Sequence, residues 1–296
     1  MPPQVRSGRF TSHGQRLAFT VHGSGDRPIV LLPGLLLPAR LNQPLAVHLA
    51  ERGHRVILLD PLGQGESARP RDMSRYSMTH FAVDTVALLD HLRIDQAIVG
   101  GTSLGANITL EVASLAPERL RGMLLEMPVL DNALVACAAA FAPLLFAVTV
   151  GEPVMRMVAA LARRVPSSRL PLLAGVFLDA LGQDPGPSGA LLQGLFFGRT
   201  APHRDERCTF STPALIIGHH RDPIHPFSDA GMLSKELPNN RLVEADSIVE
   251  MRIRPARIYS EIDSWLDEVW ARRVRVVVSR SGGRRQSRAL PRSARS

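Results

Sequence analysis

A serine flanked by two glycines carries the clearest chemical pattern in the sequence. Ser103 lies in the run Gly-Thr-Ser-Leu-Gly, between Gly101 and Gly105, directly after an apolar segment and before a segment with helical spacing. A serine on a tight turn from a strand into a helix needs small neighbours, because the turn strains the backbone and crowds the flanking residues. The helix N-terminus also favours negative charge that develops at this point. We therefore predict that Ser103 is a nucleophile for acyl chemistry.

Two loops upstream of Ser103 fit the same chemistry. Residues 32–35, Leu-Pro-Gly-Leu, follow an apolar run, and the glycine lets the backbone turn an N–H group toward the serine. The backbone amides of Leu35 and Leu104 form the predicted oxyanion hole, which would stabilise negative charge on a substrate oxygen. The turn-rich segment 60–67 carries the spacing Asp-x-x-Gly-x-Gly-x-Ser.

The elements around these loops predict a largely parallel sheet, because short β-branched runs alternate with helical patterns. Continuous apolar runs in several strands indicate a sheet covered on both faces. The predicted strands are 17–21, 28–32, 55–59, 96–99, 120–125, 214–217 and 241–244. The predicted helices of this α/β part are 38–52, 78–92, 104–115, 227–237 and 255–270.

Residues 131–212 interrupt the alternation, since they have helical spacing and no clear strand. Within them the uncharged segment 133–151 approaches the length of a membrane span, but Pro143 and the many alanines favour a buried or lid helix over a transmembrane one. We expect three parts, namely an α/β core of residues 1–130 and 213–271, a helical cap of residues 131–212, and a basic disordered tail of residues 272–296.

Together these motifs resemble those of the α/β-hydrolase fold family, in its form with a helical cap. The resemblance covers residues 9–270 and rests on the loop after residue 32, segment 60–67, the turn at Ser103 and the strand that leads to Asp222. It implies an α/β fold in which helices flank a mostly parallel central sheet and a helical cap follows the sixth strand. A serine at position 103 also disfavours dehalogenase and epoxide hydrolase chemistry, since relatives of those types use an aspartate there.

The resemblance implies that Asp222, on the loop after the seventh strand, is the acid of a Ser-acid-His triad. Glu126 and Asp131, near the end of the sixth strand, are the alternative acids, because some relatives place the acid there. The family order puts the histidine on the loop after the last strand. The sequence departs from this order, since residues 245–251 contain no histidine and none follows His225.

The missing histidine matters because serine without an adjacent base is a weak nucleophile. His219, His220 and His225 lie on the same loop as the predicted acid, and His225 is the preferred base because Pro226 and the following helix would fix its backbone. Glu250 is a weaker candidate, since an unshifted carboxyl group is a poor proton acceptor at neutral pH. A merely structural or solvent-facing role for the three histidines is the remaining alternative.

The charge of the chain is concentrated at its C-terminal end. The formal net charge is +8, but nine of the 35 Lys and Arg residues lie in residues 272–296, which contain no acid, so the rest of the chain carries −1. A body of this charge gives no reason to expect nucleic-acid binding by the core. The tail is expected to be solvated, with weak polyanion or membrane-surface binding as the alternative.

Several patterns are absent from the 296 residues. Cys137 and Cys208 are too few for a disulfide framework and are expected to be buried or idle thiols. The histidines, His22 and His203 among them, show no metal-ligand spacing, so we expect no metal and no cofactor. The N-terminal residues show no secretory signal, so a cytoplasmic location is expected.

These observations predict a serine hydrolase that acts through an acyl-enzyme on an ester, thioester, lactone or similar acyl bond of a small apolar substrate. Two alternatives stay open. One is a catalytically impaired hydrolase-fold protein that binds a ligand or partner, and the other is an acyltransferase that uses the same acyl-enzyme. The oligomeric state and the identity of the substrate do not follow from the sequence.

Overall fold

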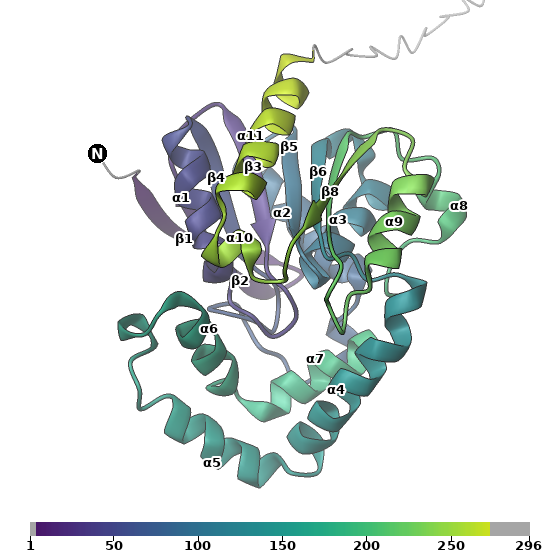
Figure 1. The fold of residues 1–296 in the computed structure, drawn as a ribbon. Coiled ribbons are helices and arrows are strands. Elements are labelled where there is room, and N and C mark those ends of the chain that lie inside the picture. Colours follow the sequence, from purple (N-terminus) through teal and green to yellow (C-terminus); the bar gives the residue numbers. More distant parts are fainter. Residues whose placement is uncertain (1–3, 273–296) are drawn as a thin grey trace, which may run out of the picture.

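Eight strands form one sheet in the computed structural model, which describes residues 4–272 (Figure 1). Their spatial order is β1-β2-β4-β3-β5-β6-β7-β8. The pairs β1/β2 and β2/β4 are antiparallel, and the remaining pairings are parallel. The strands are β1 (Val5–Ser12), β2 (Gln15–His22), β3 (Arg27–Leu32), β4 (His54–Asp60), β5 (Ala97–Thr102), β6 (Leu120–Glu126), β7 (Ala214–His219) and β8 (Asn240–Ala245).

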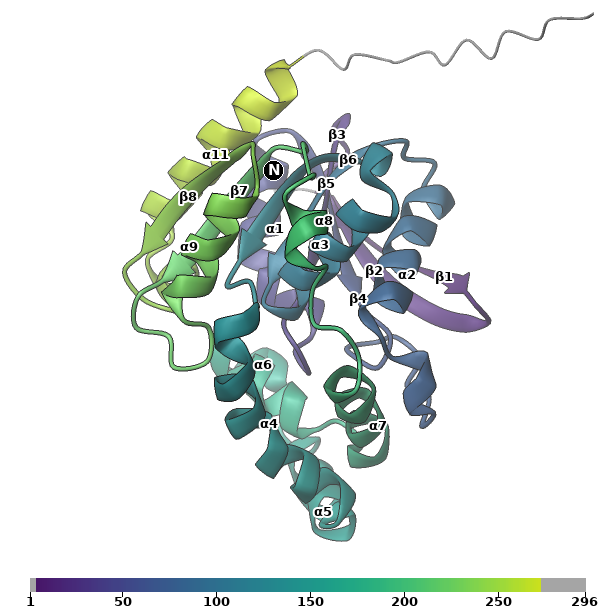
Figure 2. The same cartoon turned by 90° about the vertical axis from the view of Figure 1, so that its right-hand side faces the viewer.

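Helices cover both faces of this sheet (Figures 1 and 2). The core helices are α1 (Gln43–Glu51), α2 (Met78–His91), α3 (Leu104–Leu115), α9 (Phe227–Glu236), α10 (Glu250–Ile253) and α11 (Ala256–Ala271). Between β6 and β7 lie α4 (Leu134–Thr149), α5 (Glu152–Ala162), α6 (Leu172–Leu181), α7 (Pro185–Phe196) and α8 (Arg204–Arg207). Short 3-10 turns occur at Ala39–Asn42, Met73–Arg75, Pro117–Arg119, Asp131–Ala133 and Ser167–Arg169.

Successive residues of β3 show how the two faces are filled. Ile29 and Leu31 pack with α1 and α11, whereas Val30 and Leu32 belong to the cluster with α2, α3 and α9. Successive side chains of a strand point to opposite faces, so an uninterrupted apolar run is what a sheet covered on both sides requires. The predicted α/β-hydrolase fold, with a mostly parallel sheet flanked by helices, is confirmed.

The sequence analysis did not predict the edge strand β1. Its sequence, Val-Arg-Ser-Gly-Arg-Phe-Thr-Ser, has few apolar residues, and of these eight only Phe10 and Ser12 are buried. An antiparallel edge strand with one face in solvent needs only a few inward apolar side chains, so it lacks the apolar run that marks the central strands.

The helices α4 to α7 form a layer beyond one end of the sheet, with α5 farthest from it (Figures 1 and 2). The short helix α8 instead packs beside α3 and α9 in the core. We call residues 131–212 the helical insertion. The expected basic tail lies outside the described residues except for Arg272.

One helix of the described residues, Asp131–Thr149 with its leading 3-10 turn, is long and apolar enough to cross a membrane. Only 11% of its most apolar window is buried. The segment 133–151, predicted as a buried or lid helix, is therefore exposed for the most part, and its role as a lid stays a prediction. Apolar composition alone does not show how much of a helix finds neighbours.

Candidate active site

Ser103 lies on a strained turn between β5 and α3. Its φ angle is 54°, in the left-handed region that side-chain-bearing residues rarely adopt. A Cβ atom on Gly101 would lie 2.2 Å from the carbonyl oxygen of Leu32, and one on Gly105 would lie 2.4 Å from the same atom. The two glycines are thus required by the close approach of β3, and the strain at Ser103 marks it as a candidate functional residue.

The structure brings Ser103, His225 and Asp222 into one hydrogen-bonded chain. The Oγ atom of Ser103 is 2.8 Å from Nε2 of His225, and Nδ1 of His225 is 2.8 Å from Oδ2 of Asp222. The carboxylate accepts from Nδ1–H, which leaves Nε2 as an acceptor for the serine proton. An arrangement of this kind can activate a hydroxyl group as a nucleophile.

The loop between β7 and α9 fixes the acid and the imidazole together. Oδ1 of Asp222 accepts hydrogen bonds from the backbone N–H groups of Ile224, at 2.8 Å, and His225, at 2.9 Å. Burial alone would raise the pKa of Asp222, but the hydrogen bonds from the His225 ring and backbone lower it below the ordinary value. The carboxylate is therefore charged at neutral pH, as the orienting partner of an imidazole must be.

The other histidines of the loop have different partners. His219 is fully buried, and its Nδ1–H donates to the carbonyl oxygen of Ser247 at 2.8 Å. His220 is exposed, lies 3.1 Å from Glu244 and stacks on the ring of Phe227. Of the three histidines predicted as candidate bases, His225 is thus the one that the described contacts join to Ser103.

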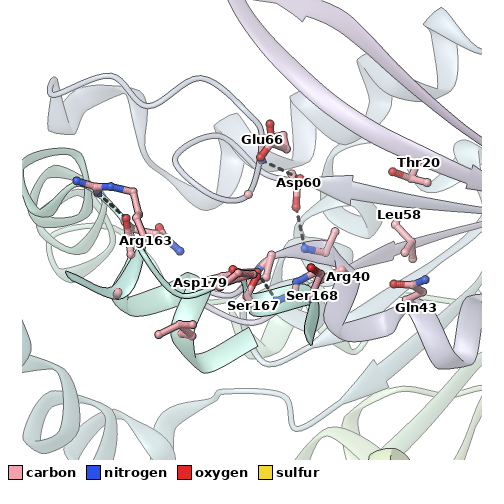
Figure 3. A pocket seen from close by; sticks show the side chains of 18 of the residues that line it. Thr20, Arg40, Gln43, Leu58, Asp60, Glu66, Arg163, Ser167, Ser168 and Asp179 are labelled. Atoms are coloured by element: carbon pink, nitrogen blue, oxygen red, sulfur yellow. Dashed lines mark hydrogen bonds and ion pairs between the residues drawn. The ribbon is translucent and has the colours of Figure 1, made fainter. Parts of the chain in front are cut away.

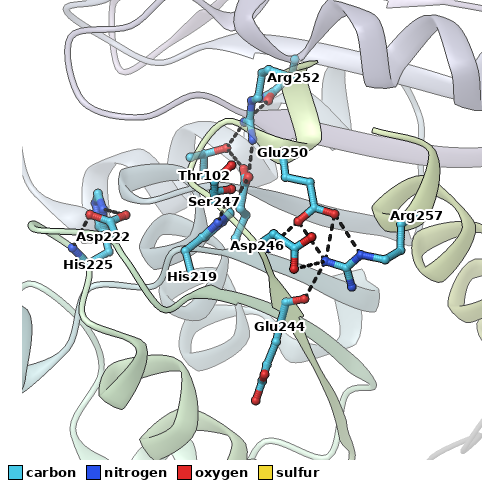
Figure 4. Close-up of polar contacts among 12 residues, drawn as sticks. Thr102, His219, Asp222, His225, Glu244, Asp246, Ser247, Glu250, Arg252 and Arg257 are labelled. Carbon is cyan, nitrogen blue, oxygen red and sulfur yellow. Dashed lines mark hydrogen bonds and ion pairs between the residues drawn. The ribbon is translucent and has the colours of Figure 1, made fainter. Parts of the chain in front are cut away.

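The loop after β8, where the family order predicts a histidine, is occupied by a separate polar cluster (Figure 4). Glu250 binds Arg257 at 2.8 Å and accepts from the backbone N–H of Asp246 at 2.5 Å. Burial would raise the pKa of Glu250, but the hydrogen bonds from Arg257 and Asp246 lower it. The alternative base Glu250 is thus held as an ion-paired carboxylate, away from His225 and Asp222 in Figure 4.

The alternative acids also lie elsewhere. Glu126, at the end of β6, is buried and forms an ion pair with Arg252. Its pKa, which burial would raise, falls to about 2 because the Arg252 guanidinium and further hydrogen bonds stabilise the carboxylate. Asp131 is exposed at the start of the helical insertion.

The Glu126 ion pair supports the turn that carries Ser103. Thr102, the residue before the serine, donates to Glu126 at 2.5 Å and accepts from Arg252 at 2.8 Å. The backbone N–H of Ser103 donates to the carbonyl oxygen of Glu126 at 2.8 Å. Removing one member would leave buried polar groups without partners, so this network fixes the strand end beneath the serine.

A mostly apolar cavity of about 290 Å³ opens at Ser103. Both Leu35 and Leu104, the residues of the predicted oxyanion hole, line it. The loop that carries Leu35 lies against the serine at Gly34, because a Cβ atom on Gly34 would lie 3.9 Å from Cβ of Ser103. The remaining lining residues are Met78, Asn107, Val129, Leu134, Cys137, Ala138, Phe141, Leu192, Leu195, Phe196 and Thr200.

The two cysteines are both free. Burial raises the pKa of the Cys137 thiol to about 11, so this group in the cavity stays protonated at neutral pH. Cys208 is exposed rather than buried. Within residues 4–272 there is no group of three His, Cys, Asp or Glu side chains that could hold a metal ion.

A second, larger cavity of about 700 Å³ lies between the core and helices α5 and α6 (Figure 3). It is lined by charged and polar side chains such as Arg40, Asp60, Arg163 and Asp179, and Ser103 is not among its lining residues. Asp60 serves structure here, since its carboxylate accepts the backbone N–H groups of Ala39 at 2.7 Å and of Glu66 at 3.0 Å. A molecule bound in the smaller cavity, and not one in the larger, would therefore contact Ser103.

Two buried polar residues that the sequence analysis missed attach the helical insertion to the core. Asp229 of α9 accepts hydrogen bonds from the backbone N–H groups of Leu130, Asn132 and Ala133. Asn107 of α3 donates to the carbonyl oxygens of Val129 and Thr200. For Asn107 the available signal was a polar side chain within the apolar run of α3, because such a residue needs partners when it is buried. The mixed polar and apolar residues around Asp229 gave no such signal.

Comparisons with known proteins agree with this architecture. Residues 27–247 match the model of the alpha/beta hydrolase fold family. The enol-lactonase of Burkholderia xenovorans LB400 has a similar structure, with a TM-score of 0.71 at 21% identity over 88% of this chain and 100% of the other. At that identity the likeness concerns the fold alone.

Two curated relatives share more sequence over shorter segments. The dihydrolipoyllysine-residue acetyltransferase component of an acetoin cleaving system from Pseudomonas putida is 40% identical over 36% of this chain. The 2-hydroxymuconate semialdehyde hydrolase of Pseudomonas sp. strain CF600 is 37% identical over 36% of this chain. The matches span only 28% and 34% of the lengths of these relatives. Because the family model covers most of the chain and the strained serine turn lies within it, the chain belongs to the alpha/beta hydrolase fold family.

Proposed function

We propose that the protein is a serine hydrolase that cleaves the acyl bond of a small apolar ester, thioester or lactone through an acyl-enzyme. The observation that carries this proposal is the hydrogen-bonded chain from Ser103 through His225 to Asp222, with 2.8 Å at each step. The family membership supports the hydrolase class, and the chemistry needs no cofactor.

In the proposed mechanism Ser103 Oγ attacks the substrate carbonyl carbon while Nε2 of His225 takes the hydroxyl proton. Asp222 stabilises the imidazolium that forms. The backbone amides of Leu35 and Leu104 donate to the oxyanion of the tetrahedral intermediate. The imidazolium then protonates the leaving alcohol or thiol, and a water molecule activated by the same ring hydrolyses the acyl-serine.

The cavity supports an apolar acyl group as the part of the substrate that is bound. Apolar side chains predominate in its lining, with Leu134 and Phe141 from α4 and Leu192 and Leu195 from α7. Burying such a group gains about 25 cal/mol for each Å² removed from water, which favours acyl chains over charged groups in this space. Helices α4 and α7 of the insertion thus act as the cap over the site.

Active-site labelling tests the proposal. A fluorophosphonate probe should modify the wild-type protein at Ser103, as mapped by mass spectrometry, and should leave Ser103→Ala unlabelled. Simple aryl esters should be turned over by the wild type and not by the variant. Absence of both labelling and turnover in the wild type would contradict the enzyme proposal and favour a hydrolase-fold protein that only binds a ligand.

Acyl transfer is the second candidate, because one of the relatives above is named as an acetyltransferase component. The same acyl-serine would pass its acyl group to an alcohol or thiol instead of water. Aryl ester turnover in the presence of a short-chain alcohol separates the two. A product ester that exceeds the free acid would favour transfer, and free acid alone would favour hydrolysis.

A further inference from the structure

The outward side of helix α5 is apolar and exposed. Val154, Met157 and Leu161 follow one another at spacings of three and four residues, and their exposed fractions are 60%, 60% and 52%. This spacing places them on one side of the helix. We call these three residues the outer stripe. The residues of α5 that are buried include Ala159, so the larger apolar side chains face away from the molecule.

The position of α5 leaves the outer stripe accessible. In both views α5 forms the edge of the molecule opposite the end of α11, beyond the sheet (Figures 1 and 2). Two further large apolar residues at the junction of α4 and α5 are exposed as well, Phe146 by 65% and Val150 by 68%. A contiguous exposed apolar surface on a helix indicates an interaction site.

The charges near the outer stripe are mostly positive. Glu152 opens α5, and residues 153–178 after it contain four arginines and no aspartate or glutamate. Arg156 and Arg163 lie toward the inward side of α5, since both line a cavity together with the buried Ala159, and Arg156 contacts Glu152 at 2.8 Å. Arg164 and Arg169 are exposed, and no described contact pairs either of them with an acid.

We propose that the outer stripe docks on a membrane surface that contains anionic lipids. Helix α5 would lie in the plane of the interface, with Val154, Met157 and Leu161 among the upper acyl chains and the exposed Arg164 and Arg169 at the lipid headgroups. A second copy of the chain fits this surface less well, because two such faces would bring Arg164 and Arg169 of both copies together, and the described contacts pair neither of them with an acid. The proposal does not depend on the hydrolase activity.

Vesicle binding by the full-length chain tests the proposal. The wild type is compared with Val154→Ser/Met157→Ser/Leu161→Ser on vesicles of phosphatidylcholine and phosphatidylglycerol in equal amounts. The vesicle affinity of the triple variant should be at least about tenfold lower than that of the wild type, because three apolar contacts with the acyl chains are lost. Residues 272–296 are identical in both proteins, so their arginines cannot cause the difference.

A fluorescence probe reports insertion directly. Leu161→Trp should be quenched by brominated acyl chains on these vesicles, whereas Leu115→Trp at the end of α3 should not. The control matches because Leu115 is 48% exposed and Leu161 is 52% exposed. Thermal unfolding should be nearly unchanged in all variants, which shows that they fold.

Three results would overturn the proposal. They are equal vesicle binding by the wild type and the triple variant, equal quenching at positions 161 and 115, and a concentration-dependent dimer that the triple variant abolishes. The last result would assign the outer stripe to a second copy of the chain.

Discussion

Asp222 and His225 lie three residues apart on the loop between β7 and α9, and their side chains meet at 2.8 Å. The same carboxylate also accepts the backbone N–H of His225, so the acid fixes both the ring and the backbone of the imidazole residue. The family order instead separates the two residues by a further strand. In this chain one short loop supplies what two loops would otherwise provide.

Replacing the imidazole tests this arrangement. His225→Gln should lower kcat/KM for aryl esters by about 10⁴-fold, because the variant has no group that takes the serine proton and returns it to the leaving group. His220→Gln is the matched control, since that exposed ring pairs with Glu244 instead of Ser103. Activity of His225→Gln within a few-fold of the wild type would remove His225 from the mechanism.

The glycines of the serine turn should not tolerate a methyl group. Gly101→Ala or Gly105→Ala places a Cβ atom 2.2 Å or 2.4 Å from the Leu32 carbonyl oxygen, so β3 or the turn must move. Each variant should unfold at lower denaturant concentration and lose most of its labelling by fluorophosphonate. Gly231→Ala in α9 is the control, because nothing lies within 4 Å of its added methyl group. This control should be unchanged or more stable by up to about 1 kcal/mol.

The size of the cavity should set the acyl chain that is accepted. Ala138→Phe adds a ring to the lining of the cavity, so kcat/KM for hexanoyl esters should fall about 10- to 100-fold while acetyl esters are little affected. Ala142→Phe, on the same helix α4 but not on the lining, is the control and should leave both substrates unchanged. Equal losses for short and long acyl chains in Ala138→Phe would place the acyl group elsewhere.

The buried ion pair under the serine turn predicts a pH dependence of stability. Glu126 has a folded-state pKa of about 2 and an ordinary value of 4.5, so the unfolded chain binds the proton more readily. The contribution of this group to the free energy of unfolding is therefore complete above about pH 4.5 and is lost as the pH falls toward 2.

Removal of the Arg252 guanidinium should reverse this pH dependence of the free energy of unfolding. Arg252→Met leaves a buried carboxylate without its partner, which should cost about 3–5 kcal/mol of unfolding free energy at pH 7. Burial then raises the pKa of Glu126, so acidification should recover part of the stability of the variant. Urea unfolding at several pH values measures both effects, and Glu126→Gln/Arg252→Met is the control without the charge. The same acid dependence in Arg252→Met as in the wild type would refute the role of the pair.

The central strands were predicted well from the sequence, because their continuous apolar runs are compatible with few structures other than a buried strand. Ile29 to Leu32 can be buried on both sides only in a covered sheet, whereas β1 escaped notice because Arg6, Ser7 and Gly8 give it no such run. Helix α4 shows that composition alone does not predict burial, since its residues are apolar enough for a buried segment but are mostly exposed. Burial depends on neighbours that the local sequence does not contain.

The same limit applies to the site. Local spacing pointed to Ser103, the family resemblance pointed to Asp222, and the sequence reduced the choice of imidazole to a few residues on one loop. Local spacing did not show that Arg252 pairs with Glu126, because these residues are far apart in sequence. They meet only when α10 lies against the ends of β5 and β6. Long-range polar contacts of this kind leave no local pattern.

The loop between β7 and α9 has a consequence for control of the protein. Because acid and imidazole share one short segment, a displacement of that segment would withdraw both from Ser103 at once. In the proposed mechanism, a protease cut or an antibody at residues 220–226 would thus stop the reaction in a single event.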